Sequence, residues 1–490
     1  MFQRAGKTGQ NSIRVALSLM FLLFVGAQMR GDQPRPALAA GSGWFRVRQN
    51  LSQSTDRTSG WPRIALGRVG SDDRYVAVVW SEEVSGASVH GSKGHVYLRW
   101  VDEAGGGWSD PVTIDSVTVS PDINNWASEP ALVMDGDTAH IVWVQRTGGN
   151  YSLRYRTYKL STAALSSVET IITSGSTQDD DIGRPDIALD GDGDPHVVWE
   201  QGDAEGQRAY YRYRKSNGTW DSEFTDSLLS EGDLDKKNDH PSVAVDGNGD
   251  IIVVWSLNKS ENGINERNDL IRYRRKTGGS WGGVQPLFNL SDDTVDSVSA
   301  NPSVASNGGD TYAIWDEHTF QASKFRLYYK KDDDWTSGKQ YTATRLPSGS
   351  VEYDSTEATG ELDYSSNLRP AAFMDSDGDL HAVWHRHLTV GGGDDPVTYE
   401  QYDVMYWSTD LSKVTGVSST EPITVATLSA DGNVLGSHNA AADVAVGHYD
   451  GEWHLHVVLM VDTGDHWDVY YLSNGFYNSV YLPTVMRNNG

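Results

Sequence analysis

The chain has 490 residues, with 40 Lys and Arg against 67 Asp and Glu, so its formal net charge is −27. An acidic surface repels phosphate groups, which argues against nucleic acids and anionic membranes as partners. It is compatible with neutral or cationic ligands and with calcium, and solubility alone is the simpler explanation. The chain has no cysteine, which excludes disulfides, cysteine catalysis and Cys-ligated zinc.

The first 40 residues predict an export signal. The basic residues Arg4, Lys7 and Arg14 precede the apolar run Val15–Ala27, an order typical of secretory signals. Cleavage is expected at the end of this run or near Ala40, and an uncleaved N-terminal anchor is the alternative. The run is short for a membrane span, and no later segment is apolar enough to cross a bilayer. We therefore expect a protein that is secreted or on the cell surface.

A recurring segment organises the rest of the chain. RPDIALDGDGDPHVVW, at Arg184–Trp199, is one of seven copies spaced 55 to 72 residues apart. Each copy reads as a first strand rich in small residues, an Asp/Gly hairpin turn and an apolar second strand that ends in Trp. A third strand alternates aromatic and basic residues, and a fourth begins at another Trp. The other copies start at Trp61, Glu129, His240, Asn301, Arg369 and Ala441.

Seven copies of this unit predict an all-β fold, a seven-bladed β-propeller of four-stranded antiparallel blades. The N-terminal segment 41–54 resembles 279–293, which is a fourth strand, and the last copy supplies only three strands. We therefore expect the N-terminal and C-terminal strands to pair in one blade and close the ring. This assigns 1–40 to the signal, 41–475 to the propeller and 476–490 to a C-terminal tail. The alternative is that the tail supplies the closing strand.

One hairpin carries a family motif. KSNGTW, at Lys215–Trp220, keeps the Ser, Gly, Thr and Trp of an Asp-box turn. On this motif the chain resembles the sialidase-like (BNR, Asp-box) repeat propeller proteins. The resemblance implies a propeller that acts on glycosides through three arginines, a Tyr–Glu nucleophile and an Asp acid/base. This chain departs from the family in having no match to that set, seven copies where six blades are usual, and a displaced proline in Pro62–Leu66. The family's catalytic route is therefore not predicted here.

The residue before the repeat proline marks a candidate ligand site. It occupies the same place in every blade, at the mouth of the axial channel, and it changes chemistry while its neighbours stay alike. A rim of solvated loop residues is the alternative interpretation. The members are Trp61, Glu129, Arg184, His240, Asn301 and Arg369, with Ala441 in the divergent last copy.

A second ring of polar residues follows the apolar strand. A carboxylate in this ring, opposite Arg184 or Arg369, could form the acid/base pair of a glycosidase. Glu200, Asp316 and His385 join the predicted mouth site. Imidazole ligation of a metal is the alternative role for the histidines. The whole ring is Glu82, Gln145, Glu200, Asp316, Glu317, His318, His385, Arg386 and His387.

The Asp-rich turns 190–194, 246–250 and 375–379 have two interpretations. Clustered carboxylates suit calcium, yet none of the turns has the downstream Glu of an EF-hand loop. Gly beside Asp or Asn is what a tight hairpin requires, so we predict turns, with no metal and no cofactor, and keep calcium as the alternative. We also predict structural roles in the core for the repeating Trp residues and for His140, His196, His381 and His456.

These observations favour an exported binding module, a monomer that holds a glycan or protein ligand at the channel mouth. The absence of a complete catalytic motif supports binding over catalysis. One alternative is a sialidase-like glycoside hydrolase or a polysaccharide lyase. Another is a structural cell-surface module.

Overall fold

A computed structural model describes most of the chain between residues 47 and 474. The chain divides into Met1–Ala37 and Leu38–Gly490, and every described residue belongs to the second unit, which is considered by itself below. The expected export signal and the tail 476–490 lie outside the described residues. These are 47–54, 57–83, 93–119, 125–174, 181–203, 206–221, 229–230, 237–258, 268–288, 297–319, 324–332, 335, 344–345, 364–390, 399–415, 422–427, 442–462 and 466–474.

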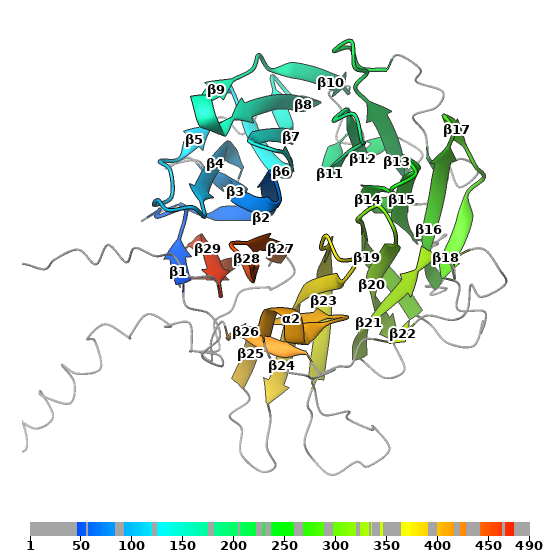
Figure 1. Ribbon diagram of the computed structural model, residues 1–490. Helices are drawn as coiled ribbons and strands as arrows, with labels where there is room; N and C mark the ends of the chain where they lie inside the picture. Colours follow the sequence, from blue (N-terminus) through cyan, green and yellow to red (C-terminus); the bar gives the residue numbers. More distant parts are fainter. Residues whose placement is uncertain are drawn as a thin grey trace, which may run out of the picture. The chain divides into compact units, whose positions relative to one another are not determined.

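The described residues form an all-β structure, which confirms the predicted class. The regular structure is almost entirely antiparallel β-sheet (Figure 1). The exceptions are a short helix, α2 (Leu411–Thr415), and a 3-10 turn at Leu160–Thr162. No helix among the described residues has the length and apolarity needed to span a membrane.

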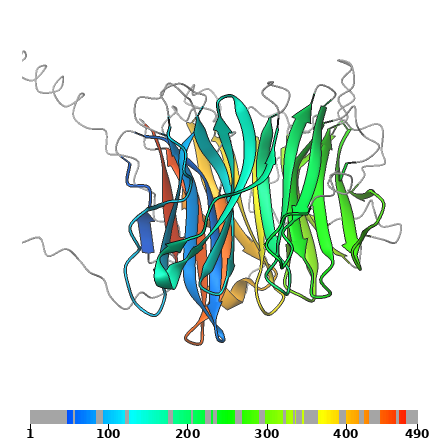
Figure 2. The ribbon, with the colours of Figure 1, turned by 90° about the horizontal axis from the view of Figure 1, so that it is seen from above.

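Each of the seven repeats contributes strands in the predicted order. The first strands are β2 (Ser59–Val69), β6 (Trp126–Asp135), β11 (Ile182–Leu189), β14 (Lys237–Val245), β19 (Ser297–Ser306), β23 (Tyr364–Met374) and β27 (Ala442–Tyr449). The second strands are β3 (Asp72–Glu83), β7 (Thr138–Thr147), β12 (Pro195–Asp203), β15 (Ile251–Asn258), β20 (Thr311–Thr319), β24 (Leu380–Val390) and β28 (Glu452–Asp462). Figure 2 shows β2–β3 and β27–β28 turning at the same end of the sheets.

The third and fourth strands complete the sheets. The third strands are β4 (Gly94–Asp102), β8 (Asn150–Lys159), β13 (Gly206–Tyr213), β16 (Asn268–Thr277), β21 (Lys324–Lys331), β25 (Tyr399–Ser408) and β29 (Trp467–Ser473). Shorter outer strands pair with them, namely β5 (Val112–Thr113), β9 (Ala164–Leu165), β10 (Glu169–Thr173), β17 (Ser280–Trp281), β18 (Gln285–Phe288), β22 (Thr344–Arg345) and β26 (Ile423–Thr427). Brief pairings of β4 with β6 and of β16 with β19 link neighbouring sheets.

The two ends of the described chain share one sheet. The N-terminal strand β1 (Val47–Asn50) pairs antiparallel with β29, in the order β1-β29-β28-β27. The sequence predicted this pairing, because 41–54 resembles the fourth strand of another repeat. Each first strand also packs beside the first strand of the next repeat, and β27 packs beside β2 (Figure 1).

The repeated tryptophans form the core between sheets, as predicted. Trp255 is fully buried against Val198 and Tyr211 of the preceding repeat, and Trp80 packs in the same way against Val458 of the last repeat. A large apolar side chain at this position fills the space between two sheets and excludes water from both. The six equivalent residues are Trp80, Trp143, Trp199, Trp255, Trp315 and Trp384.

The Asp-rich segments are hairpin turns stabilised by their first aspartate. In the turn that begins at Asp190, Oδ1 accepts the backbone N–H groups of Asp192 and Asp194 at 3.0 and 2.9 Å. Gly193 adopts φ = 79°, which explains the glycine. The turns beginning at Asp246 and Asp375 repeat these contacts.

Candidate functional site

The residue before the repeat proline lies in a β-bulge. The pairing of the first and second strands shifts register at this point in six repeats, for example between Gly183 and Asp186. In five of these repeats the bulged residue takes a left-handed backbone, which costs about 1–3 kcal/mol for a residue with a side chain. Bulges and strain of this kind concentrate at functional sites, because they re-aim a side chain. The φ values are 54° for Trp61, 52° for Glu129, 47° for Arg184, 54° for His240 and 48° for Asn301.

The bulges border a central cavity. A cavity of about 420 Å³ is lined by the first strands of all seven repeats, which places the variable positions of different repeats around one space. This volume is within the range of small-molecule sites, about 300–1,000 Å³. Five of the predicted mouth residues line it, namely Trp61, Glu129, Arg184, His240 and Asn301. All five are half-buried. The side chain of Arg369 lies outside the described residues.

Three successive repeats bring their polar residues into contact. The backbone N–H of Arg184 donates to Oε2 of Glu129 at 2.7 Å. In the next repeat, the backbone N–H of His240 donates to Oε2 of Glu200 at 3.0 Å. The bulged backbone of one repeat is therefore held by a carboxylate of the repeat before it. The contact occurs both between repeats 2 and 3 and between repeats 3 and 4. It joins four of the predicted residues, Glu129, Arg184, Glu200 and His240, into one cluster.

The Arg184 guanidinium lies at the centre of this cluster. One nitrogen, Nη1, lies 3.4 Å from Oε2 of Glu200 and donates to Nδ1 of His240 at 2.9 Å. The same nitrogen lies 4.0 Å from Oδ2 of Asp239. We call Glu129, Arg184, Glu200, Asp239 and His240 the mouth cluster.

Glu200 has the most perturbed environment in the mouth cluster. Burial raises its pKa to about 7, and the neighbouring carboxylates of Asp239 and Glu129 add to the rise, while Arg184 opposes it. Only 5% of the residue is exposed. Its Oε1 accepts the side-chain amide of Gln207 at 2.9 Å. Glu200 can therefore carry a proton near neutral pH, as a general acid must.

Gly183 lets the two glutamates approach each other. A Cβ at this position would stand 3.1 Å from Oε1 of Glu200 and 3.5 Å from Oε2 of Glu129. Both oxygens are therefore within 3.5 Å of one point and at most about 7 Å apart. The sequence prediction did not single out Gly183, Asp239 or Gln207. Gly183 and Asp239 could have been found from the sequence, since each directly precedes a bulged residue.

The remaining predicted residues make contacts outside the mouth cluster. Asn301 Nδ2 donates to Oδ1 of Asp316 at 2.9 Å, within one repeat. Glu82 accepts the Arg57 guanidinium at 3.1 Å and the Ser59 hydroxyl at 3.2 Å, and burial raises its pKa.

His385 is buried, and Arg386 pairs with Asp403. The side chain of Gln145 donates to the Thr147 hydroxyl at 3.2 Å. Glu317 is buried next to Asp316. The side chains of His318 and His387 lie outside the described residues.

Below the bulges, polar side chains connect the first strands. Oδ2 of Asp186 accepts the backbone N–H of Val243 in the next repeat at 3.0 Å. Ser242 and Ser303 take the same role toward the repeats that follow them, at 3.2 and 3.1 Å. Such bonds satisfy backbone groups of the first strands that have no partner within their own repeat. They also hold the bulged residues above them in place.

Comparison with known proteins gives similarities of structure only. No family model and no curated protein matches the chain. A protein of unknown function from Dyadobacter fermentans is 10% identical, with a TM-score of 0.42, over 88% of this chain and 98% of its own. An α-L-arabinofuranosidase from Fusarium graminearum is 10% identical, with a TM-score of 0.43, over 67% of this chain and 88% of its own.

A polysaccharide lyase described as an ulvan lyase is 12% identical, with a TM-score of 0.39, over 70% of this chain and 84% of its own. The similar structures thus include glycoside hydrolases and polysaccharide lyases. At TM-scores below 0.5 these similarities do not extend to function, and the resemblance to sialidase-like repeats stays a prediction.

Proposed function

We propose that the seven repeats form a closed seven-bladed β-propeller, exported and monomeric, whose mouth cluster hydrolyses glycosides. The observation that carries this proposal is Glu200, a buried carboxyl group with a pKa raised to about 7, placed beside a second carboxylate. Glycoside hydrolysis uses two carboxyl groups with different protonation states at the same pH. The proposed chemistry uses protein side chains alone and needs no cofactor.

The two glutamates have separate roles in this proposal. Glu200 donates a proton to the glycosidic oxygen as the leaving group departs. Glu129, which accepts the backbone N–H of Arg184, is the partner carboxylate and assists the attack of water, whose oxygen forms the new bond to the anomeric carbon in place of the glycosidic bond. Their separation of at most about 7 Å is compatible with the spacing of glycosidase carboxylates, about 5–9.5 Å. Arg184 and His240 fix the position of Glu200.

The surroundings of the cluster favour a neutral or amino sugar over an anionic one. Asp239 adds negative charge within the cluster, and Glu82 and Asp316 add it on the second strands of other repeats. This potential opposes a substrate carboxylate or sulfate. Trp61 lines the cavity and offers an apolar face against which a sugar ring can pack.

One observation favours a second candidate, a glycan-binding module without turnover. The polar groups of the mouth cluster already satisfy one another, with Glu200 contacting Gln207, His240 and Arg184. A network of this kind presents a rigid surface, which lowers the entropic cost of binding. The two candidates differ in whether Glu200 has to exchange a proton.

The test is release of reducing ends from a panel of neutral and amino-sugar polysaccharides by the full chain. We expect turnover by the wild type and a loss of about 10²–10⁴-fold in Glu200→Gln, because that variant holds no transferable proton. Binding of the same glycan, measured by calorimetry, should change much less. Glu169→Gln is the matched control, since Glu169 is a half-buried carboxylate on an outer strand that contacts Arg214.

Saturable glycan binding with no turnover would establish the binding module in place of the enzyme. Turnover that survives in both Glu200→Gln and Glu129→Gln would place catalysis elsewhere. Absence of both binding and turnover across the panel would remove the mouth cluster as a glycan site.

A further inference from the structure

A buried histidine of the second strand has the same two partners in repeats 3 and 6. Its Nδ1 contacts a tyrosine hydroxyl of the third strand, and its Nε2 contacts the first aspartate of the hairpin turn. His196 contacts Tyr211 at 2.6 Å and Asp190 at 3.2 Å. His381 contacts Tyr406 at 2.7 Å and Asp375 at 3.2 Å.

In repeat 7 the histidine keeps the tyrosine but the aspartate position changes. Nδ1 of His456 lies 2.7 Å from the hydroxyl of Tyr471. Gly447 stands where repeats 3 and 6 have the first aspartate of the turn, Asp190 and Asp375. A Cβ on Gly447 would meet Leu66 at 2.7 Å and Asp73 at 2.8 Å, so the close approach of repeat 1 requires glycine. The Nε2 side of His456 therefore has a different neighbourhood from its counterparts.

The junction of repeats 1 and 7 supplies new groups to this space. Glu103, which follows β4 of repeat 1, contacts Nδ1 of His454 through its Oε2. His454 precedes His456 by two residues on β28, so both rings lie on one face of the strand. One donor atom from each of the three residues lies within 4.8 Å of the others. The three residues are 9%, 6% and 1% exposed for Glu103, His454 and His456.

We propose that Glu103, His454 and His456 bind a zinc ion that joins the first repeat to the last. Two imidazoles and one carboxylate form a donor set that suits Zn²⁺, whereas calcium takes six to eight oxygen ligands. Bonds of about 2.0–2.2 Å bring zinc ligands to roughly 3.5 Å of one another, so each side chain moves by about 1 Å or less. A water molecule takes the fourth position.

The surroundings of His456 suit this role. The Tyr471 hydroxyl fixes the ring through Nδ1, as outer partners of metal-bound histidines do, and leaves Nε2 for the ion.

Other hairpins hold a cationic side chain of the protein against their aspartates. In repeat 6 the Lys413 ammonium lies 2.8 Å from Asp375 and 3.2 Å from Asp377. In repeat 4 the Arg275 guanidinium lies 2.8 Å from Asp246. In both hairpins a cationic side chain balances the buried acidic groups. In repeat 7 the zinc ion balances Glu103 in the same way.

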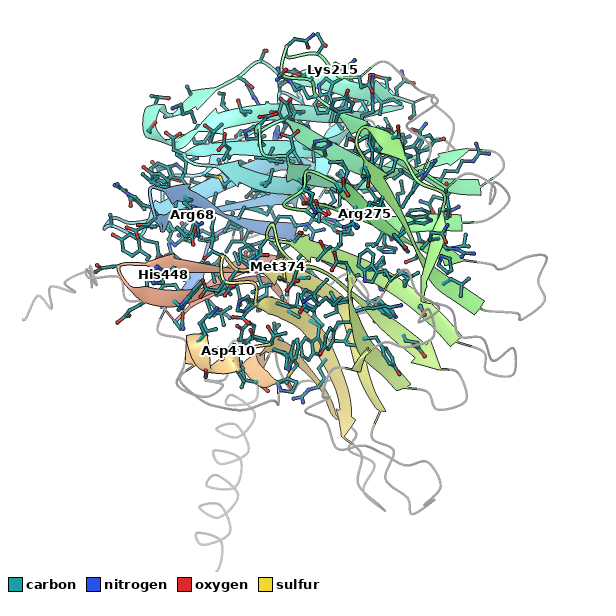
Figure 3. The ribbon with its side chains drawn as sticks, turned by 45° about the vertical axis from the view of Figure 1, so that its right-hand side comes forward. Arg68, Lys215, Arg275, Met374, Asp410 and His448 are labelled. Atoms are coloured by element: carbon teal, nitrogen blue, oxygen red, sulfur yellow. The ribbon has the colours of Figure 1, made fainter. Side chains whose placement is uncertain are left out.

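The location gives the ion a structural function. Glu103 and His454 are 351 residues apart in sequence, so the ion closes a very long loop. The same junction is held by Asp73, which accepts the backbone N–H of His448 at 2.9 Å and pairs with Arg68 at 2.9 Å. Figure 3 shows Arg68 and His448 on these adjoining hairpins.

The experiment titrates Zn²⁺ into full-length protein treated with chelator, in a buffer with excess Ca²⁺ to occupy weak acidic sites. Calorimetry should give one Zn²⁺ per chain, and thermal unfolding should shift upward with Zn²⁺, because the ion binds the folded state. Glu103→Gln and His454→Gln should each lower the affinity by more than about tenfold and abolish the thermal shift. Glu452→Gln, which removes an exposed carboxylate from the same hairpin, should bind as the wild type.

Co²⁺ gives an independent readout if His454→Gln folds poorly. Its visible absorption reports the ligand set, so the nearly isosteric Glu103→Gln should change the spectrum or eliminate it. A wild type that shows no saturable binding at one ion per chain would overturn the proposal. Equal affinity and equal spectra in the wild type and Glu103→Gln would do the same.

Discussion

The backbone N–H of Ile64 in the first repeat donates to Oδ2 of Asp443 in the last repeat, at 3.0 Å. The same contact joins Val243 to Asp186 in the middle of the chain, at 3.0 Å. Repeats that are 379 residues apart therefore meet through the contact that joins sequential neighbours. Any change that weakens this contact should affect the whole protein, because it lies where the two ends of the chain come together.

Asp443→Asn should flatten the pH dependence of stability. Burial raises the pKa of Asp443 to about 6, with the nearby Asp186 adding to the rise. Between the ordinary aspartate pKa and about 6, the folded protein binds more protons than the unfolded chain, so the free energy of unfolding falls as pH rises.

Between pH 4 and 7 we expect the wild type to lose about 1–2 kcal/mol more stability than the variant does. Urea unfolding across this range measures the difference. Asp192→Asn, at an exposed position of a hairpin turn, is the control and should keep the wild-type slope. Parallel curves for the wild type and Asp443→Asn would contradict the assignment.

The activity of the mouth cluster should decline above about pH 7, because Glu200 then loses the proton it donates. Arg184→Ala removes the positive charge that lowers the pKa of Glu200, so the alkaline limb should move to higher pH. The pH dependence of kcat/KM measures this shift. A limb that stays in place or moves to lower pH would show that Glu200 is not the titrating acid.

Arg184→Gly should be more stable than Arg184→Ala by about 1–2 kcal/mol. Both variants lose the guanidinium, and only alanine keeps a side chain at φ = 47°. Denaturant unfolding of the pair isolates the backbone strain at the bulge. Equal stabilities would show that the left-handed backbone costs little here.

Trp255→Ala should destabilise the protein by about 3–5 kcal/mol, because it leaves a cavity between two sheets where a fully buried ring now packs. Val69→Ala is the control, since Val69 is 42% exposed and should change stability by less than about 0.5 kcal/mol. Guanidinium unfolding of both variants gives the comparison. A small effect at Trp255 would mean that neighbouring sheets do not depend on this side chain.

The sequence by itself determined the strands, their order and the core. The small residues of the first strand, the Asp/Gly turn and the buried Trp are local sequence patterns. Each one reflects a local need of this repeat, either to turn between two strands or to pack against the next sheet. The sequence also located the variable position before the proline, because packing does not restrain that residue. The turn at Asp190 and the burial of Trp255 follow directly from such patterns.

Only the tertiary structure decided which variable residues meet. Arg184 and His240 converge on Glu200 because a register shift and a left-handed backbone turn their positions toward the preceding repeat. Asn301 has the same backbone but pairs with Asp316 in its own repeat. Likewise, Glu103 reaches His454 only because the first and last repeats adjoin. Contacts between repeats depend on small rotations at each bulge and junction, and the periodicity of a strand carries no information about them.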